Sequence, residues 1–552
     1  MTYLNSSINT KGILSLIVSI LIAFIVLFYF AILGYFQYDF PFYDDYNVVL
    51  KTILDWQTTT SFSQKIAQLF AQHNEHRLVV VRSISLLDYF LRGKIVFTDL
   101  IWLGNLSLLV VGWVLYKSRG SWVVGRGQKT SSPFFTFHFS LFTTSLLLFQ
   151  FQSWDNQFWA MASIQNFGIY AFVCLSVYFA TQQKPCLALL FAALCVGTSG
   201  SGLFIVPTLL LFYFIQKQWR NLTISAVVLG TLCLLYFYQY QSSSQNGSVI
   251  NRLLHGNWLE MAMFFGAFLG NNLYHPALPF VAPVVGWVGA GWVLYLLFSK
   301  YYKVNPTLFY ILVFILLTAI AAALLRSSRG LEGAYPSRYR ITSSLFLATI
   351  FLTSMHVLES KIRSWVLAIG LIGSLALYVL SIYVYFPRIR NNQELRMADA
   401  WFFENGYNVA GHFDSVFATD ILKKSDTIFG VPKVEASHSS TFDIFLKVVK
   451  NKPDTNTEYG IDWINPSKSA IKGWVRFLKP VTAQKIYVVV NGTVYETLFF
   501  KRYDLVASQK SAAYQDTGFL AMLPPMVNIS KQNWYLIATN NRGEQVRIDN
   551  VK

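Results

Sequence analysis

The feature that most constrains this chain is a series of long apolar runs separated by short polar connections. The first run, residues 13–36, is long enough to cross the hydrocarbon core of a bilayer, which takes about 20 helical residues. It lacks the small-residue cleavage site of a signal peptide, so we interpret it as a retained helix. Only 13% of the 552 residues are charged, against roughly a quarter in soluble proteins. We therefore predict an α-helical polytopic membrane protein.

Hydropathy predicts about eleven transmembrane helices. They cover residues 13–35, 97–116, 133–151, 163–180, 185–198, 202–216, 222–240, 278–299, 306–325, 341–358 and 364–386. The fifth and sixth are short and are separated by residues 198–202, so a single broken pair is the alternative. The run 258–273 is apolar but too short to span, and we interpret it as re-entrant or interfacial.

Basic residues gather in alternate connections, and this sets the predicted orientation. With the N-terminus in the cytoplasm, the inner connections contain Lys11, Lys117, Arg119, Arg126, Lys129, Lys184, Lys217, Arg220, Lys300, Lys303, Lys361 and Arg363. Glu359 is the only acid among them, a positive-inside pattern. An odd number of spans puts the chain after Phe386 outside. These connections and lipid headgroups account for the net charge of +17, so we expect no nucleic-acid partner.

The tail has a different composition. We divide it into a mixed connecting region, 391–460, which begins with helical spacing, and a small antiparallel β-sandwich, 461–552. Within the sandwich, Asn491-Gly492 separates two β-rich runs, 485–490 and 493–498. This is the strongest short hairpin signal, because both residues tolerate the positive φ of a type I′ turn.

Two adjacent acids follow the first predicted span and form the first candidate site. Asp44 and Asp45 would lie at the outer membrane surface, at the start of an interfacial helix. A carboxylate in low-dielectric surroundings beside another charge is suited to act as a general base. The alternative is that one of them caps that helix by accepting its free N–H groups.

A second polar cluster follows in the same outer loop, 37–96. His73 and Arg77 are four residues apart, and His73 and His76 three apart, which would put them on one helix face. We predict that His73, Glu75, His76 and Arg77 supply contacts to a substrate. A polar interfacial helix end is the alternative, and a divalent cation is a second one, although the spacing matches no recognised metal motif.

Two further outer connections are candidates for substrate binding. Residues 326–340 contain four arginines on the side where positive charge is disfavoured, and guanidinium groups bind phosphate bidentately. Lipid headgroups are the alternative ligand for these arginines. The connection 152–159 contains Trp154, Asp155 and Gln157, which suit the ring face and hydroxyls of a sugar, or form part of an interfacial aromatic belt.

Other site types are not indicated. The four cysteines, Cys174, Cys186, Cys195 and Cys233, all fall inside apolar runs, where we interpret them as small buried side chains rather than as disulfide or zinc ligands. The sequence contains neither a phosphate loop nor a Gly-rich strand-to-helix turn. We therefore expect no nucleotide-driven pump and no cofactor.

Together these features resemble the GT-C superfamily of membrane glycosyltransferases, in the branch with an acidic residue in the first extracytoplasmic loop. The resemblance rests on Asp44-Asp45 just past the first span, interfacial helices before the second, about eleven spans and an exterior C-terminal domain. The segments Asn74-Glu75-His76-Arg77 and Pro336-Ser337-Arg338-Tyr339 also resemble segments of bacterial membrane proteins of this class. The resemblance covers roughly residues 1–390, which would form the catalytic domain.

The resemblance implies an inverting transferase in the bacterial inner or plasma membrane. Asp44 or Asp45 would deprotonate the acceptor hydroxyl, and Arg329, Arg338 and Arg340 are candidates to hold the phosphate of a polyprenyl-phosphate-linked sugar donor. The acceptor would be an envelope glycan, lipid or protein. The tail, with Gly473-Trp474 and Gly518-Phe519, resembles a β-domain of bacterial carbohydrate-active proteins, and a packing or interaction module is the alternative.

Two rival functions use the same architecture. A polysaccharide polymerase or ligase would also take lipid-linked sugars, and a flippase or transporter would move them across the bilayer. Acids placed directly after the first span favour the transferase, whereas a charged cavity at the bilayer midplane would favour transport.

Overall fold

The computed structural model describes most of the helical region and eight strands of the tail. The described residues are 10–118, 133–241, 257–404, 406, 409, 414–432, 457–465, 470–477, 483–490, 493–500, 517–522, 534–540 and 545–548. Several positions used above lie outside them, namely Arg119, Arg126, Lys129, Asn491 and Gly492.

Eight of the described helices are long and apolar enough to cross a membrane, by length and composition. They are α1 (Thr10–Phe36), α5 (Phe97–Lys117), α8 (Ala160–Thr181), α11 (Trp219–Phe237), α14 (Val281–Phe298), α15 (Pro306–Arg326), α16 (Arg340–Val357) and α17 (Ser360–Glu404). The other three predicted spans are helical but shorter: α6 (Pro133–Leu148), α9 (Pro185–Thr198) and α10 (Ile205–Ile215). The apolar run before residue 273 forms the short helix α13 (Trp258–Leu269).

The predicted first outer loop also contains helices. They are α2 (Lys51–Thr58), α3 (Phe62–Leu69) and α4 (Val79–Arg92). One short helix, α7 (Trp154–Gln157), precedes α8, and α18 (Ser415–Lys424) follows α17.

Contacts divide the chain into two compact units. The first comprises Met1–Tyr35, Asp55–Leu87 and Asp99–Tyr383, and the second comprises Phe36–Leu54, Asp88–Thr98 and Val384–Lys552. This differs from the domain boundaries that the sequence predicts, because the outer loop 37–96 is shared between the units. The predicted boundary near residue 390 also falls inside the continuous helix α17.

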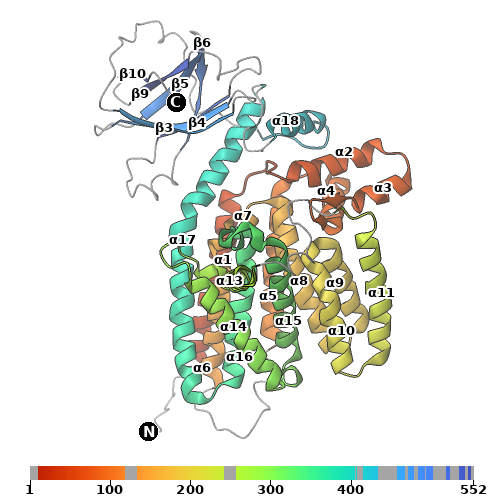
Figure 1. The fold of residues 1–552 in the computed structure, drawn as a ribbon. Helices are drawn as coiled ribbons and strands as arrows, with labels where there is room; N and C mark the ends of the chain where they lie inside the picture. Colours follow the sequence, from red (N-terminus) through yellow and green to blue (C-terminus); the bar gives the residue numbers. More distant parts are fainter. Residues whose placement is uncertain are drawn as a thin grey trace, which may run out of the picture. The chain divides into compact units, whose positions relative to one another are not determined.

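The first unit is a bundle in which α8, α9, α10, α11 and α15 lie side by side (Figure 1). Left-handed residues end the helices at three of its turns, Gln183, Lys217 and Lys300, where the chain reverses. Proline at the first position starts α9 and α15, and the side chain of Asn305 caps α15 by accepting from Leu308 N. The bundle is therefore built from helical hairpins.

Five connections of this bundle meet at one end, which we call the basic end. Gln218 Nε2 donates to Gln183 Oε1 at 3.2 Å, joining the turn after α10 to the turn after α8. Asn305 Nδ2 donates to Ser118 O at 2.6 Å, and Tyr301 OH lies 2.5 Å from His356 Nδ1. These contacts bring the turn after α14 to the ends of α5 and α16. Basic residues predicted to be cytoplasmic lie in these connections: Lys117, Lys184, Lys217, Lys300, Lys303 and Lys361.

The tail of the second unit contains two four-stranded antiparallel sheets. One has the strand order β10-β9-β5-β6, with β10 (Gln545–Ile548), β9 (Trp534–Asn540), β5 (Ala483–Val490) and β6 (Thr493–Glu496). The other has the order β3-β4-β8-β7, with β3 (Thr457–Asn465), β4 (Ala470–Phe477), β8 (Gly518–Met522) and β7 (Leu498–Phe500). Val490 pairs with Thr493, the two residues that flank the expected turn.

One buried cluster joins the two sheets. It includes Ile471 and Val475 of β4 together with Val488 of β5 and Leu536 of β9. Alternate residues of β5, Tyr487 and Val489, pack on the opposite face of their sheet. The tail therefore has a core of its own.

The cysteine interpretation holds for two of the four positions. Cys174 and Cys195 are buried, whereas Cys186 is exposed on α9 and Cys233 is half-buried on α11. The prediction was wrong for Cys186 and Cys233 because a helix in lipid can expose an apolar thiol. A position in an apolar run therefore need not be buried inside the protein.

Helices α13 and α14 approach so closely that only glycine fits between them. A Cβ at Gly286 of α14 would lie 2.0 Å from Gly266 O of α13, whereas a Cβ at Gly291 of the same helix meets nothing within 4 Å. Small residues allow this close approach of membrane helices.

We expect Gly286→Ala to destabilise the protein by about 1–3 kcal/mol, because the added methyl group has no room without a shift of one helix. Gly291→Ala is the matched control and should be neutral or slightly stabilising. Thermal unfolding of both variants in detergent measures the difference. Equal unfolding temperatures would contradict the close packing of α13 on α14.

Candidate functional site

The polar segment 72–77 forms a β-hairpin instead of the predicted helix face. Strands β1 (Gln72–His73) and β2 (His76–Arg77) pair antiparallel, with His73 opposite His76. The turn uses Asn74 at φ 50°, a left-handed conformation that asparagine tolerates. The helical interpretation was wrong because two residues three apart share a face in a helix and also face each other across a two-residue turn.

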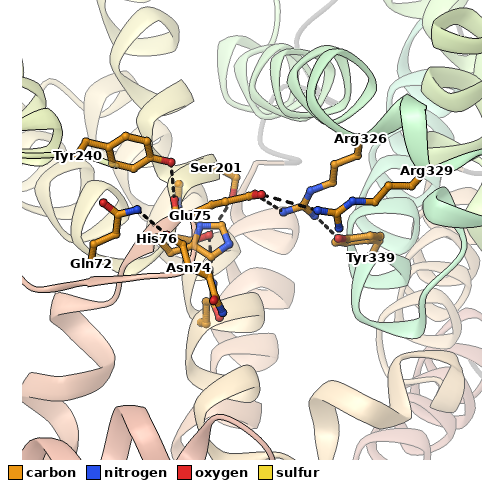
Figure 2. A network of polar contacts seen from close by, with 12 residues as sticks. Gln72, Asn74, Glu75, His76, Ser201, Tyr240, Arg326, Arg329 and Tyr339 are labelled. Atoms are coloured by element: carbon orange, nitrogen blue, oxygen red, sulfur yellow. Dashed lines mark hydrogen bonds and ion pairs between the residues drawn. The ribbon is translucent and has the colours of Figure 1, made fainter. Parts of the chain in front are cut away.

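Glu75, at the tip of this hairpin, binds two arginines of the 326–340 connection (Figure 2). Glu75 Oε2 lies 3.2 Å from Arg326 Nη2, and Glu75 Oε1 lies 3.8 Å from Arg329 Nη2. Arg326 also donates to the hydroxyl of Tyr339. The guanidinium groups of Arg326 and Arg338 lie 5.3 and 5.2 Å from the Tyr339 ring centre, within cation–π range. We call Glu75, Arg326, Arg329, Arg338 and Tyr339 the arginine cluster.

Main-chain contacts fix the hairpin beneath the arginine cluster. The hydroxyls of Tyr236 and Tyr240 both donate to Glu75 O at 3.3 Å. Gly200 N donates to His76 Nδ1 at 3.1 Å, and a Cβ at Gly200 would lie 2.9 Å from the same nitrogen. The break between α9 and α10 therefore holds the hairpin, and a side chain at position 200 would crowd the His76 ring.

His76 is a neutral donor in this arrangement. Its Nδ1 accepts from Gly200, so the proton of the neutral ring is on Nε2. Burial and the positive charge of Arg326 lower the pKa of His76 to about 4. The ring therefore offers an N–H group but no charge near neutral pH.

Arg77 and Arg82 have structural partners. Arg77 donates from Nε to Tyr236 O at 2.5 Å, and its other nitrogens donate to Phe70 O and Tyr238 O. Arg82 Nη1 donates to Leu69 O at 3.1 Å. Both arginines satisfy carbonyls at helix ends that have no partner within the helix. This favours a structural role for Arg77 over the predicted substrate contact.

Two buried asparagines hold the backbone of the arginine-bearing connection. Asn156 Nδ2 donates to Arg338 O at 2.9 Å, and Asn271 Nδ2 donates to Ala334 O at 2.9 Å. The ring of Tyr335 stacks on Tyr274 with centres 3.6 Å apart. The connection is thus ordered by contacts with α7 and with the turn after α13.

The segment around Trp154 lies at the same end of the bundle, through Asn156. Trp154 and Asp155 are half-buried, whereas Gln157 is 1% exposed and donates from Nε2 to Gln150 O at 2.7 Å. Gln157 therefore supports the fold, and Trp154 and Asp155 are the two predicted sugar contacts that keep accessible surface.

A layer of buried amides lies next to this segment. In the amide orientation that satisfies its neighbours, Asn272 donates to Arg340 O and Gln152 Oε1 and accepts from Gln150 Nε2 and Ser344 Oγ. Arg340 itself is 8% exposed, so it is much less accessible than Arg329 and Arg338, which are exposed. This layer favours a structural position for Arg340.

Asp44 and Asp45 belong to the second unit and differ from each other. Asp45 is completely buried, and its Oδ2 accepts from Phe42 N at 3.0 Å. This bond reaches backward along the chain, so the predicted alternative, a cap on the following helix, is not what the carboxylate forms. Asp44 is half-buried, and its main-chain carbonyl accepts from Val48 N at 2.8 Å.

Asp45 is part of a buried charged group that the sequence analysis missed. Burial, with Asp399 and Asp45 nearby, raises the pKa of Tyr46, while the positive charge of Arg396 opposes this shift. Arg396 lies 4.5 Å from the ring centre of Phe42. Arg396 and Asp399 are on α17, and their spacing of three residues, which places both on one face of the helix, was the available signal.

Comparison with known proteins gives no relative for this chain. No protein-family model, curated protein or solved structure matches it. Among the residues that the structure describes, no group of three or more His, Cys, Asp or Glu side chains could hold a metal ion.

We expect the protein to lose stability as pH falls from about 6.5 to about 4. Unfolded His76 titrates near 6.5, so in this window the unfolded chain binds a proton that the folded chain does not. The contribution of His76 is on the order of 3 kcal/mol across the window. His76→Gln should flatten the dependence of the unfolding temperature on pH, and the exposed His275→Gln should not. Parallel pH profiles for the wild type and His76→Gln would refute the assignment.

Proposed function

We propose that this protein is a membrane glycosyltransferase that moves a sugar from a polyprenyl-phosphate donor to an envelope acceptor outside the cytoplasm. The observation that carries the proposal is the position of the arginine cluster. It lies at the end of the first unit opposite the basic end, because α9 begins beside Lys184 and ends where Gly200 binds His76. Positive charge is disfavoured on the outer side of a membrane, so a phosphate ligand gives these arginines a function.

The chemistry of the cluster suits the departing phosphate. Arginine binds phosphate oxygens through two parallel N–H bonds, and fixed guanidinium groups stabilise negative charge as it develops. Arg329 and Arg338 are exposed, and the backbone of Arg338 is held by Asn156. Tyr339, flanked by two guanidinium groups, would contact the lipid chain or the sugar next to the phosphate.

Asp44 is our choice for the general base, because it is the more accessible of the two adjacent acids. Its carboxylate would take the proton of the acceptor hydroxyl, whose oxygen attacks the anomeric carbon. The bond from that carbon to the phosphate oxygen breaks, and polyprenyl phosphate leaves with the bonding electron pair. Asp45, with its bond to Phe42 N and the neighbouring Arg396, would fix the backbone that presents Asp44.

The orientation has a direct test within the first unit. Exposed residues at its two ends, Ser328 and Gln182, can be changed to cysteine singly. We expect a membrane-impermeant maleimide added to intact cells to label Ser328→Cys, and to label Gln182→Cys only after lysis. Labelling of Gln182→Cys alone in intact cells would reverse the topology and remove the argument from charge. Because Cys186 is exposed, both variants should be made in a Cys186→Ser background.

We expect Asp44→Asn to reduce transfer by at least about a hundredfold, because a general base contributes on this scale. The variant should still fold and bind the donor. Transfer from radiolabelled undecaprenyl-phosphate sugars to membrane acceptors measures the effect.

The control for Asp44→Asn is Asp55→Asn on α2, which should keep its activity. Asp45→Asn should instead lower the unfolding temperature, because it leaves Arg396 with less compensating charge in a buried place. Full activity of Asp44→Asn would exclude it as the base.

A further inference from the structure

We propose that Arg326 and Arg329 form an anion-binding site whose resident occupant is the carboxylate of Glu75. A phosphate monoester would bind there by displacing Glu75, so that the hairpin 72–77 sets the affinity of the site. The identity of the ligand as a prenyl phosphate rests on the proposed function, whereas the competition between Glu75 and phosphate does not.

The geometry of the cluster is that of a filled site. Each oxygen of Glu75 faces a different arginine, at 3.2 and 3.8 Å, so one carboxylate bridges two guanidinium groups as a phosphate would (Figure 2). A phosphate monoester has more oxygens and up to twice the charge. It can therefore pair with both arginines more completely than Glu75 does.

Displacement of Glu75 requires only a side-chain rotation. The backbone of Glu75 is fixed through its carbonyl, which accepts from Tyr236 and Tyr240. The connection that bears the arginines, on the other side of the site, is fixed by hydrogen bonds from Asn156 and Asn271. The Glu75 side chain is 18% exposed and lies at the tip of a turn, so it can rotate toward solvent while the hairpin and the arginine-bearing connection stay in place.

When no ligand is bound, the carboxylate of Glu75 stabilises the two neighbouring guanidinium groups electrostatically. Arg326 and Glu75 are each 18% exposed at their side chains, and two guanidinium groups this close would repel each other without a carboxylate. Glu75 therefore keeps the arginines oriented and at the same time competes with an external anion. Removing the Glu75 charge therefore shows which effect is larger: lost orientation of the arginines would weaken anion binding, and lost competition would strengthen it.

The test compares Glu75→Gln with Glu332→Gln in the full-length protein in detergent. Glutamine keeps the shape and removes the charge, and Glu332 is an exposed acid of the same connection that serves as the matched control. Binding of inorganic phosphate and of farnesyl phosphate is measured by calorimetry. We expect Glu75→Gln to bind both probes about tenfold more tightly, and Glu332→Gln to change affinity by no more than about twofold. Arg326→Gln should weaken binding at least about tenfold.

Unchanged or weaker binding by folded Glu75→Gln would overturn the inference and make Glu75 a structural ion pair. If Glu75→Gln does not fold, Glu75→Asp replaces it. The shorter carboxylate cannot bridge both arginines, and it should bind at least about threefold more tightly; weaker or equal binding would again overturn the inference.

The two probes separate the sources of phosphate. Tighter binding of farnesyl phosphate with the same dependence on Glu75 supports a lipid-linked ligand, and equal binding supports a free phosphate. A protein that shows the Glu75 effect but transfers no sugar would refute only the proposed function. A protein with Asp44-dependent transfer and no Glu75 effect would refute only the competition.

Discussion

Hydrocarbon offers no hydrogen-bond partner to a peptide group, and the rest of this structure depends on how the chain meets that requirement. The apolar segments form helices, which satisfy their backbone internally. Where the helices of the first unit are interrupted, side chains donate hydrogen bonds to the main-chain carbonyls left without a partner. Arg77 does so at the end of α11, Arg82 at the end of α3, and Asn271 in the connection before α16. These interruptions are what leave room for a polar site among membrane helices.

The same residue type serves three purposes at that site. Arg77 binds carbonyl groups, Arg326 binds a carboxylate and Arg338 lies over an aromatic ring. Their sequence contexts do not distinguish these roles, since each is a basic residue in a polar stretch. Burial and partners do, and they separate the arginines that bind main-chain carbonyls from those that lie against a carboxylate or an aromatic ring.

The sequence was informative where a local pattern is compatible with only one conformation. Apolar runs placed the helices, basic residues identified the connections that meet at the basic end, and Asn491-Gly492 located the pairing of β5 with β6. The prediction failed where two conformations share a spacing, as for His73 and His76. It was silent where partners are distant in the chain, because nothing near Asp45 signals Arg396, and nothing near Glu75 signals Arg326 or Tyr240. The arginines of the connection 326–340 were singled out from charge alone, whereas their carboxylate partner, Glu75, required the fold.

The hairpin is held through the main-chain oxygen of residue 75, and its side chain takes no part in that attachment. Position 75 is therefore one at which a single codon change alters the charge presented to the arginines while the main-chain attachment of the hairpin stays the same. Glutamate, aspartate or glutamine at this position would give the proposed anion site different affinities for the same ligand. Selection could adjust the working concentration range of such a site through one residue, while the surrounding residues remain constrained by folding.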